Sequence, residues 1–292
     1  MIAKSEFDYP ALYKGAGQLS AESQSYYLNL IRAEYVALLV AAVLSLNLSS
    51  NVVYLVSNAF VFLVAIGILL TRSNQRPEQN WYKGRALAES IKTSCWRYCM
   101  RAEPFGDVDS VAERKSEFRA YLLKILETNR HIGDRLPPDS AAEHQITPSM
   151  EATRALSLEE RKVYYHDKRI KEQRTWYVNK ARANANSSRR WVKFGVAVYA
   201  FAIIFVLLRI AYPEQTTWPT EPLIVLASAV IGWTQVKKFN ELSSSYTLTA
   251  HEIGIIQGKV ADISGEEDFS DFVNEAEQAF SREHTQWVAR QS

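Results

Sequence analysis

Hydrophobic residues gather in two long runs, each of which is interrupted once by a short polar patch. The first run extends over residues 33–70 and is broken at 47–51, and the second extends over 191–236 and is broken at 213–222. A helix needs about 20 apolar residues to cross the roughly 30 Å hydrocarbon core of a bilayer. The pattern therefore predicts two membrane hairpins of two spans each, joined by soluble segments.

The four expected spans differ in length and polarity. Residues 52–70 carry no charge and form the strongest span, and residues 191–212 form another that carries Arg209 close to its end, where the side chain can reach the headgroups. Residues 35–48 and 223–236 are short, and runs of this length can also be buried core helices. We favour membrane spans because each short run is separated from a strong one by only a short linker.

Lysine and arginine flank the expected spans but are absent from both hairpin tips. Neither 47–51 nor 213–222 contains a basic residue, whereas basic clusters follow residue 70, precede residue 191 and follow residue 236. By the positive-inside tendency, both tips face outward and both termini lie in the cytoplasm. The basic clusters are also expected to attract anionic lipid, and nucleic-acid binding is the alternative use of such clusters.

The rest of the chain has helical periodicity. Residues 81–102, 113–132 and 269–287 each carry an apolar stripe at three- and four-residue intervals. Residues 72–80 are expected to form a turn and residues 133–148, which hold three prolines, a loop. Essentially no stretch alternates with the period of a strand, so the predicted fold class is all-α, a four-span helical membrane protein with long cytoplasmic helices.

Helix boundaries follow from the positions of serine, proline and glycine. Residues 1–20 are expected to be a poorly patterned lead-in, with the first helix beginning at Ser20. Ser157 and Glu160 have the form of a capping box, after which no proline or glycine occurs before the third span. The helix from there would be a rod of about 75–80 Å, of which about 45 Å would project from the membrane as a stalk. Residues 264–267 resemble a second capping box, at the start of a terminal helix.

The order helix, two spans, helix occurs twice along the chain. We expect four segments: a first helix/two-span/helix unit at residues 1–102, a cytoplasmic helical linker at 103–157, a second helix/two-span/helix unit at 158–259, and a C-terminal cytoplasmic helix at 260–292. Both hairpins enter the membrane from the same side. The two membrane hairpins therefore form a parallel repeat, related by an axis along the membrane normal.

No catalytic or metal-binding motif is found in the sequence. The only cysteines, Cys95 and Cys99, fall on the expected cytoplasmic side, where thiols stay reduced. Their spacing allows two metal ligands on one helix face, but we expect ordinary buried thiols. The five histidines are far apart, and no glycine-rich phosphate-binding motif is present. We therefore expect neither enzymatic activity nor a metal or other cofactor.

Polar side chains inside the spans are the remaining candidates for function. Ser57 and Asn58 lie in the second span, Arg209 in the third, and Ser228 and Thr234 in the fourth. An amide that faces lipid without a partner is costly. In the structural interpretation, Asn58 bonds to a neighbouring helix, Arg209 reaches outward, and the two small residues allow close helix packing. In the functional interpretation, all five are pore-lining residues along a water-filled path.

Three stretches of the chain resemble the bacterial SLATT family. Residues 81–105 are similar to the family's segment after a first hairpin, residues 158–177 to the run-up to a second, and residues 281–287 to its tail. SLATT proteins are two-transmembrane effector domains found beside nucleotide-signal sensors in anti-phage systems. The resemblance implies an effector of the bacterial inner membrane, which forms a pore or disrupts the bilayer when a companion defence or sensor protein activates it.

Two functions remain open at this point. The first is an oligomeric effector, since four spans in one chain are too few to enclose a wide channel. The second is a non-conducting membrane scaffold that recruits a cytoplasmic partner through its helical stalk. Both interpretations place the chain in the lipid bilayer, and neither requires it to bind nucleic acid directly.

Overall fold

The computed structural model describes residues 7–289 except 47, 107–109 and 142–144, and it does not describe the side chains of residue 131 and residues 282–289. Helices account for nearly all of this part of the chain, and none of the described residues lies in a strand. The predicted all-α class is therefore confirmed over the described residues. Contacts between helices divide the chain into two compact units. We call residues 25–77 with 180–244 the hairpin unit, and the remaining described residues the bundle unit.

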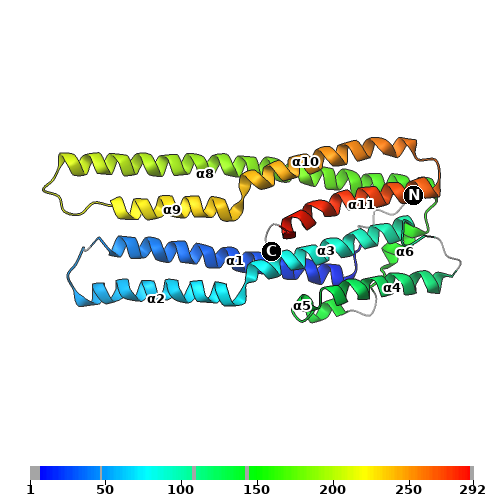
Figure 1. Ribbon diagram of the computed structural model, residues 1–292, viewed down its shortest axis with the longest axis horizontal. Helices are drawn as coiled ribbons and strands as arrows, with labels where there is room; N and C mark the ends of the chain where they lie inside the picture. Colours follow the sequence, from blue (N-terminus) through cyan, green and yellow to red (C-terminus); the bar gives the residue numbers. More distant parts are fainter. Residues whose placement is uncertain (1–6, 47, 107–109, 142–144, 290–292) are drawn as a thin grey trace. The chain divides into compact units, whose positions relative to one another are not determined.

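The hairpin unit contains two antiparallel helix pairs (Figure 1). They are formed by α1 (Ala11–Leu44) with α2 (Val52–Gln75), and by α8 (Glu172–Ala211) with α9 (Thr220–Lys237). Both α1 and α8 begin in the bundle unit and continue into the hairpin unit.

Three helical stretches are long and apolar enough to cross a membrane, judged by length and composition. They are Ala11–Leu44, Val52–Met100 and Leu158–Ala211, and their most apolar windows are only 28%, 0% and 11% buried. In water such large apolar surfaces would be covered. Lipid or a neighbouring chain would cover these exposed apolar surfaces. The fourth expected span, α9, is not among these three stretches.

Each hairpin ends at a single residue in the left-handed region. Arg76 closes α2 with φ 43° and donates its N–H to the carbonyl of Arg72, and Lys238 closes α9 with φ 47° and donates to the carbonyl of Thr234. The chain resumes at once in α3 (Pro77–Met100) and α10 (Phe239–Gly258). The predicted turn over 72–80 is therefore wrong. A left-handed C-cap followed by proline at the first helical position redirects the chain within one residue.

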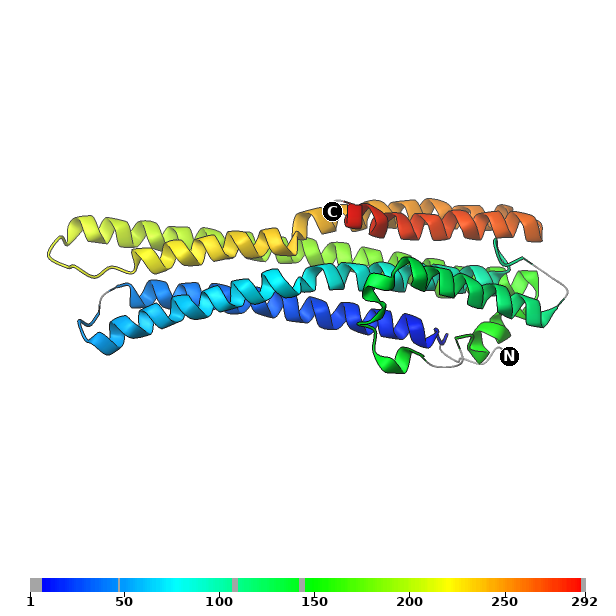
Figure 2. The same ribbon diagram turned by 60° about the horizontal axis from the view of Figure 1, so that its bottom comes forward.

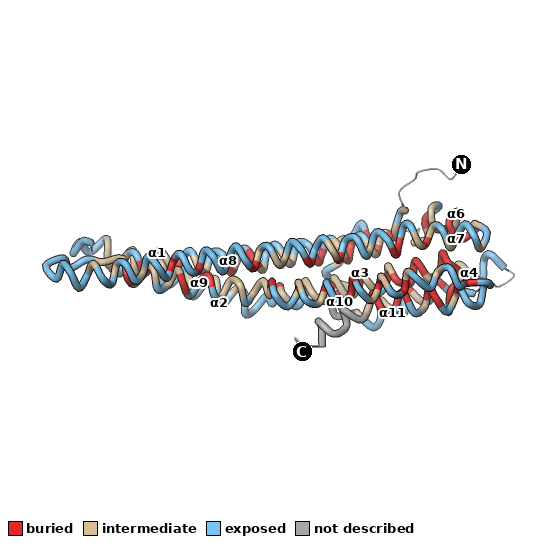
Figure 3. The backbone as a smooth tube through the Cα atoms, turned by 90° about the horizontal axis from the view of Figure 1, so that it is seen from above, coloured by how far each residue is buried: buried red, intermediate tan, exposed pale blue. Residues whose placement is uncertain are grey.

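The bundle unit has α3 at its centre. Its remaining elements are α4 (Val111–Thr128), α5 (Arg130–Gly133), the 3₁₀ turn η1 (Pro138–Ala141), α6 (Pro148–Arg154), α7 (Leu158–Tyr165), the π-helix η2 (His166–Lys171), α10, the 3₁₀ turn η3 (Lys259–Asp262) and α11 (Glu266–Ala289). Figures 1 and 2 show α11 running antiparallel beside α10, and α4 beside α3. Buried positions gather along α3 and α11 in Figure 3.

The predicted stripes of α4 and α11 are core residues. Phe118 and Leu122 on α4 are buried, and the α11 positions Phe269, Val273 and Phe280 are buried as well. Aromatic contacts connect the stripe of α4 to α3, since the rings of Tyr98 and Phe118 are 4.6 Å apart. The side chain of residue 287, which the sequence assigned to the terminal stripe, lies outside the described residues.

The first helix begins nine residues earlier than the sequence predicted. Residues 11–20 are helical although Gly15 and Gly17 disfavour a helix by about 1 kcal/mol each relative to alanine. Tertiary packing outweighs this cost, since Leu12, Ala16 and Leu19 are buried. Gly15 also permits a close approach by η1, because a Cβ atom at this position would lie 2.4 Å from Cβ of Ser140.

The predicted stalk is helical but does not stand free. The helix continues from Leu158 to Ala211 through the π-helical segment η2. Its first part belongs to the bundle unit, where Tyr165, Ile170 and Tyr177 are fully buried. Val163 is 62% exposed, so the heptad positions do not form one continuous seam. The periodicity had identified part of the core face, and the neighbouring helices that cover it were not visible in the sequence.

The first capping box is confirmed and the second differs by one residue. Ser157 and Glu160 satisfy each other's backbone amides at the start of α7. At the start of α11, Ser264 bonds to the carboxylate of Asp268 and not to that of Glu267.

Candidate functional site

Four charged residues of the hairpin unit are paired with one another or with an aromatic ring. Glu34 on α1 and Arg72 on α2 form an ion pair of 2.8 Å. The guanidinium of Arg32 lies 5.2 Å from the ring centre of Trp233, and the ammonium of Lys237 lies 5.8 Å from it. Cation–π contacts of this kind are favourable, most of all when partly desolvated. The short first span can therefore extend through Arg32 and Glu34, because both charges have partners.

Close helix packing in the hairpin unit depends on a glycine of α9. A Cβ atom built on Gly232 would lie 2.3 Å from the hydroxyl oxygen of Tyr35 on α1. Gly195 on α8 faces Val230 on α9 with more room, at 3.5 Å. Small residues commonly let membrane helices approach in this way. Gly232 therefore sets how closely α9 packs against α1.

The five polar residues predicted to line a path lie on three helices, α2, α8 and α9. The amide nitrogen of Asn58 donates to the hydroxyl of Ser45 at 3.3 Å, while its buried carbonyl oxygen has no hydrogen-bond partner. The hydroxyl of Ser57 donates to the carbonyl of Val53 at 2.7 Å. That of Thr234 donates to the carbonyl of Ile231 at 2.8 Å. Both of these hydrogen bonds are made within a single helix.

The remaining candidates are exposed. Arg209 and Ser228 are exposed, as is Ser57. None of the hydrogen bonds of the five candidates joins two of them. The exposed ones are accessible to lipid or to a neighbouring copy.

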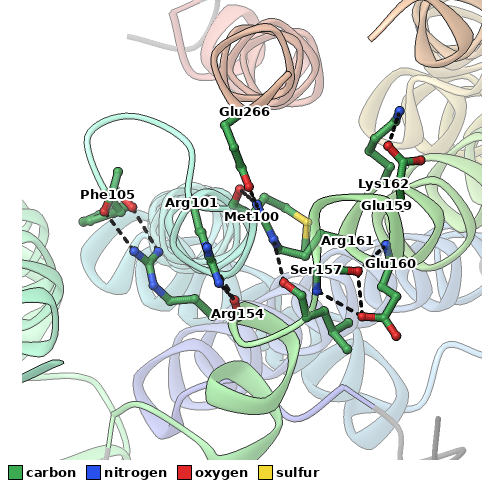
Figure 4. Close-up of polar contacts among 12 residues, drawn as sticks. Met100, Arg101, Phe105, Arg154, Ser157, Glu159, Glu160, Arg161, Lys162 and Glu266 are labelled. Carbon is green, nitrogen blue, oxygen red and sulfur yellow. Dashed lines mark hydrogen bonds and ion pairs between the residues drawn. The ribbon is translucent and has the colours of Figure 1, made fainter. Parts of the chain in front are cut away.

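Three buried arginines hold the bundle unit together. Arg154, Arg161 and Arg169 are 5%, 0% and 2% exposed and come from α6, α7 and η2 respectively. Figure 4 shows the first two beside the end of α3. The sequence analysis did not identify this set, because charged residues in amphipathic helices are usually solvated.

The first two arginines bind the end of α3. Arg154 donates to the carbonyls of Tyr98, Phe105 and Gly106, the last two at 3.0 and 2.9 Å, and lies over the ring of Tyr98. Arg161 donates to the carbonyl of Met100 at 2.7 Å and forms an ion pair with Glu266 of α11 (Figure 4). The Met100 carbonyl is at the last residue of α3, where backbone acceptors lack a partner within the helix, and those of Phe105 and Gly106 lie in the segment that follows.

The third arginine forms a fully buried ion pair with α11. Arg169 donates its Nε to Oε1 of Glu277 at 2.8 Å and one terminal nitrogen to Oε2 at 2.6 Å. Tyr165 donates its hydroxyl to the same carboxylate at 2.9 Å. Burial acts to lower the pKa of Arg169, but the adjacent Glu277 carboxylate raises it above its usual value. Two-point geometry of this kind is among the stronger arrangements for a buried pair.

The arginine of this ion pair, Arg169, lies on a π-helical segment. Arg169 and Ile170 are the buried residues of η2, which spans His166–Lys171 between α7 and α8. A π-helix inserted between α-helices is uncommon and is frequent at functional sites. It links α11 to the chain that continues directly into α8.

The two cysteines lie on α3 and are buried in the core of the bundle unit. Both are 0% exposed, and burial raises the pKa of each thiol above its usual value. Because metals and electrophiles react with the thiolate, neutral buried thiols are poor ligands and poor nucleophiles. Among the residues described by the structure, no cluster of three or more histidine, cysteine or acidic side chains is placed to hold a metal ion.

Over the described residues, the fold and these contacts define an all-helical protein with a unit of long apolar helices and a tightly packed helical bundle. Two family matches cover nearly the whole chain: residues 10–162 match the SMODS and SLOG-associating 2TM effector domain 3, and residues 165–287 match the SMODS and SLOG-associating 2TM effector domain 1. The chain therefore belongs to the SLATT family. No curated protein and no solved structure matches it.

Proposed function

We propose that this protein is an oligomeric membrane effector of bacterial anti-phage defence, which opens a pore in the inner membrane or disrupts it once a companion protein activates it. Membership in a family of two-transmembrane effector domains supports a role at the membrane. The observation that carries the proposal is the exposure of the apolar helices, since none of the most apolar window of Val52–Met100 is buried. Such a surface requires lipid or another chain around it.

Four spans are part of the proposal. Each of the two matched domains is a two-transmembrane domain, and each contains one helix pair of the hairpin unit. The fourth helix, α9, has 18 residues, which gives about 27 Å at 1.5 Å per residue and nearly spans the hydrocarbon core. Its Ala227 and Val230 are buried, so α9 is packed inside the hairpin unit together with helices that can cross a bilayer.

A parallel repeat is supported by the ends of the two hairpins. Arg76 and Lys238 occupy corresponding places, one after each returning helix, and share a left-handed conformation and the same type of backbone hydrogen bond. A helix that continues into the bundle unit follows each of them directly. Two hairpins with the same break and the same order of helices are expected of a duplicated unit.

Oligomerisation is supported by where the polar candidates lie. Four helices leave no room for a wide channel, and Ser57, Arg209 and Ser228 are exposed on the single chain. A polar side chain at membrane depth is costly when it faces lipid. Contacts between copies would cover these residues or place them along a shared path. The four expected segments of the chain, the cytoplasmic termini, the absence of catalysis and the absence of direct nucleic-acid binding belong to the same proposal.

The test is ion flux through liposomes that contain the purified full-length chain. We expect dye release or ion conductance to rise steeply with protein density in the bilayer, as assembly from several copies requires. A dense, correctly inserted and oligomeric preparation that conducts nothing, with and without its companion protein, would favour the non-conducting scaffold. That scaffold would have to recruit partners through the surface of the bundle unit, since the predicted stalk is packed within it.

A further inference from the structure

A polar cavity of about 370 Å³ opens in the bundle unit, between the start of α1, α3, and the η2–α8 segment. This volume is within the range of sites for small organic ligands. Basic side chains outnumber acidic ones in its lining, four to two: Arg85, Lys92, Lys168 and Arg169 against Glu89 and Glu172.

Two of these cations converge on one neutral oxygen. The ammonium of Lys92 lies 3.4 Å from Oε1 of Gln173, and a terminal nitrogen of Arg169 lies 3.2 Å from the same atom. The remaining donors of Arg169 are directed at Glu277, which also accepts from Tyr165. The Glu277 carboxylate already compensates the charge of Arg169, whereas Lys92 has the Glu89 carboxylate only at 3.9 Å. An amide oxygen carries only a partial charge, so it adds little compensation for Lys92. A full negative charge at this point would be favoured by both.

Of the two cations, Lys92 would be stabilised most by an added negative charge. Its side chain is only 16% exposed. Burial lowers its pKa, and the positive charges of Arg169 and Arg85 lower it further, against the opposing effect of Glu89 and Glu277. The Glu89 carboxylate is 3.9 Å away, at the edge of ion-pair distance. Because charges interact more strongly where water is scarce, an added anion would interact strongly with this ammonium.

Aromatic side chains form another part of the wall. The rings of Tyr9 and Tyr13 are 4.5 Å apart, and the Tyr9 hydroxyl accepts a hydrogen bond from the indole of Trp96 at 2.9 Å. Trp176 also lines the cavity, and its ring packs edge-on against that of the buried Tyr177. These contacts fix the orientation of two of the rings. A flat apolar group could therefore pack against preformed surfaces.

We propose that this cavity binds a small ligand that carries a phosphate monoester next to a flat ring. The phosphate would lie against Lys92 and Arg169, and the ring against Tyr9, Tyr13 or Trp176. A phosphate dianion suits two converging cations, since one of them is a guanidinium whose planar donors match phosphate oxygens. Lys168 and Glu172 also line the cavity, 3.4 Å apart and more than half exposed, and as a pair they add no net charge to it.

Phenyl phosphate tests this on the full-length protein in detergent, with inorganic phosphate and phenol as partial probes. Calorimetry and thermal unfolding report binding without any need for conductance, so the result is independent of the proposed function. We expect phenyl phosphate to bind about tenfold more tightly than either partial probe. Lys92→Met should weaken it by about tenfold or more and leave the unfolding temperature unchanged or higher, because a buried like-charge repulsion is removed.

Lys171→Met is the control, since Lys171 lies on the π-helix that carries Arg169, is exposed and does not line the cavity. We expect this variant to bind as the parent does. Equal losses in both variants would overturn the assignment of Lys92, and equal binding of phenyl phosphate and inorganic phosphate would overturn the ring subsite. Absence of binding of all three probes to the folded parent at about 10 mM would overturn the proposal as a whole.

Discussion

At the scale of single residues, the bundle unit is held by charges that have been removed from water. Arg169 and Glu277 are 2% and 0% exposed and meet through two hydrogen bonds. Breaking a buried pair by removing one partner leaves an uncompensated charge, which typically costs 3–5 kcal/mol. The pair also connects η2 to α11, so its loss affects two elements.

Glu277→Gln should therefore lower the free energy of unfolding by about 3–5 kcal/mol. The amide keeps the shape of the carboxylate but leaves the Arg169 guanidinium without its counter-charge. Chemical denaturation of the full-length protein in detergent, followed by circular dichroism, measures the change. Glu275→Gln is the control on the same helix, because Glu275 pairs with Lys259 at the surface, where both side chains are about half exposed. We expect the control to change stability by less than about 1 kcal/mol. Equal effects of the two substitutions would contradict a structural role for the buried pair.

Lys92 makes stability depend on pH in a defined direction. Because its pKa in the folded protein is lowered, mainly by burial, the unfolded chain binds more protons between that value and about 10.4. Stability should therefore rise with pH within this window, as the buried ammonium becomes neutral. The difference in unfolding temperature between Lys92→Met and the parent should shrink as pH increases from about 7 to about 10. A difference that stays constant over this range would show that Lys92 does not titrate as its surroundings imply.

At the scale of elements, α9 approaches α1 through the space left by Gly232. An alanine at this position would place its methyl group against the hydroxyl of Tyr35, 2.3 Å from it, so the tyrosine or the helix has to move. The ring carbon that bears the hydroxyl lies at 3.1 Å, which is tight but can relax. The clash is therefore largely with one oxygen atom.

Gly232→Ala should lower the thermal stability of the protein in detergent, and Tyr35→Phe should restore most of the loss in the double variant. Overpacking of this kind typically costs 1–3 kcal/mol before relaxation. The double-mutant cycle separates this contact from any general effect of alanine on the helix. Gly17→Ala is a matched control, because nothing lies within 4 Å of a Cβ atom at that site. Additive effects of Gly232→Ala and Tyr35→Phe would disprove the contact.

The helix breaks belong to the same scale. Arg76 and Lys238 adopt the left-handed conformation although neither is glycine, and this costs about 1–2 kcal/mol per residue. The following residues start new helices immediately, so the cost is offset by the packing of α3 and α10 in the bundle unit. The predicted nine-residue turn was wrong because Pro77 was interpreted as a turn residue, whereas here it is the first residue of α3.

At the scale of the whole molecule, topology is open to a direct measurement. Ser50 and Thr216 lie in the two hairpin tips and are exposed. Cysteine introduced at either site should react with a membrane-impermeant maleimide in intact spheroplasts, if both tips face outward. The native Cys95 and Cys99 should give little background, because both are fully buried and their thiols are neutral. Failure of both introduced cysteines to react, with normal labelling after lysis, would reverse the proposed orientation.

The pore hypothesis is tested by the polar residues of the spans. If Asn58 lines a conducting path, Asn58→Leu should reduce conductance and leave insertion intact, because leucine makes the helix more apolar. The variant also removes the bond to Ser45, so Ser45→Ala is the control for lost helix packing. We expect Ser45→Ala to conduct as the parent does, and equal losses in the two variants would assign Asn58 to packing.

Arg209→Glu addresses the same hypothesis through charge. A fixed charge in a narrow passage acts on ions far more strongly than one in water. The substitution should therefore shift the reversal potential of a reconstituted channel from anion preference toward cations. Unchanged selectivity and flux would leave Arg209 at the interface with the headgroups, where its exposed side chain can reach them.

The sequence by itself determined the helical class, the membership in the SLATT family and the positions of the apolar helices. These properties depend on local patterns: helical periodicity, runs of apolar residues, and caps such as Ser157 with Glu160. Each is encoded within a few turns of chain, so neighbours in the sequence are enough to recognise it. The start of the first helix was missed for the same reason, because Gly15 and Gly17 argue against a helix locally and only packing favours it.

Only the tertiary structure decided which charged residues meet. Arg161 and Glu266 are separated by 105 residues, and Arg169 and Glu277 by 108. Nothing in the sequence distinguishes these arginines from solvated ones, since burial depends on which helices cover them. The same holds for Lys92, which is brought near Arg169 by the packing of α3 against η2 and α8. Long-range packing removes water from these groups, and the loss of water is what makes a charge in this chain structural or able to bind a ligand.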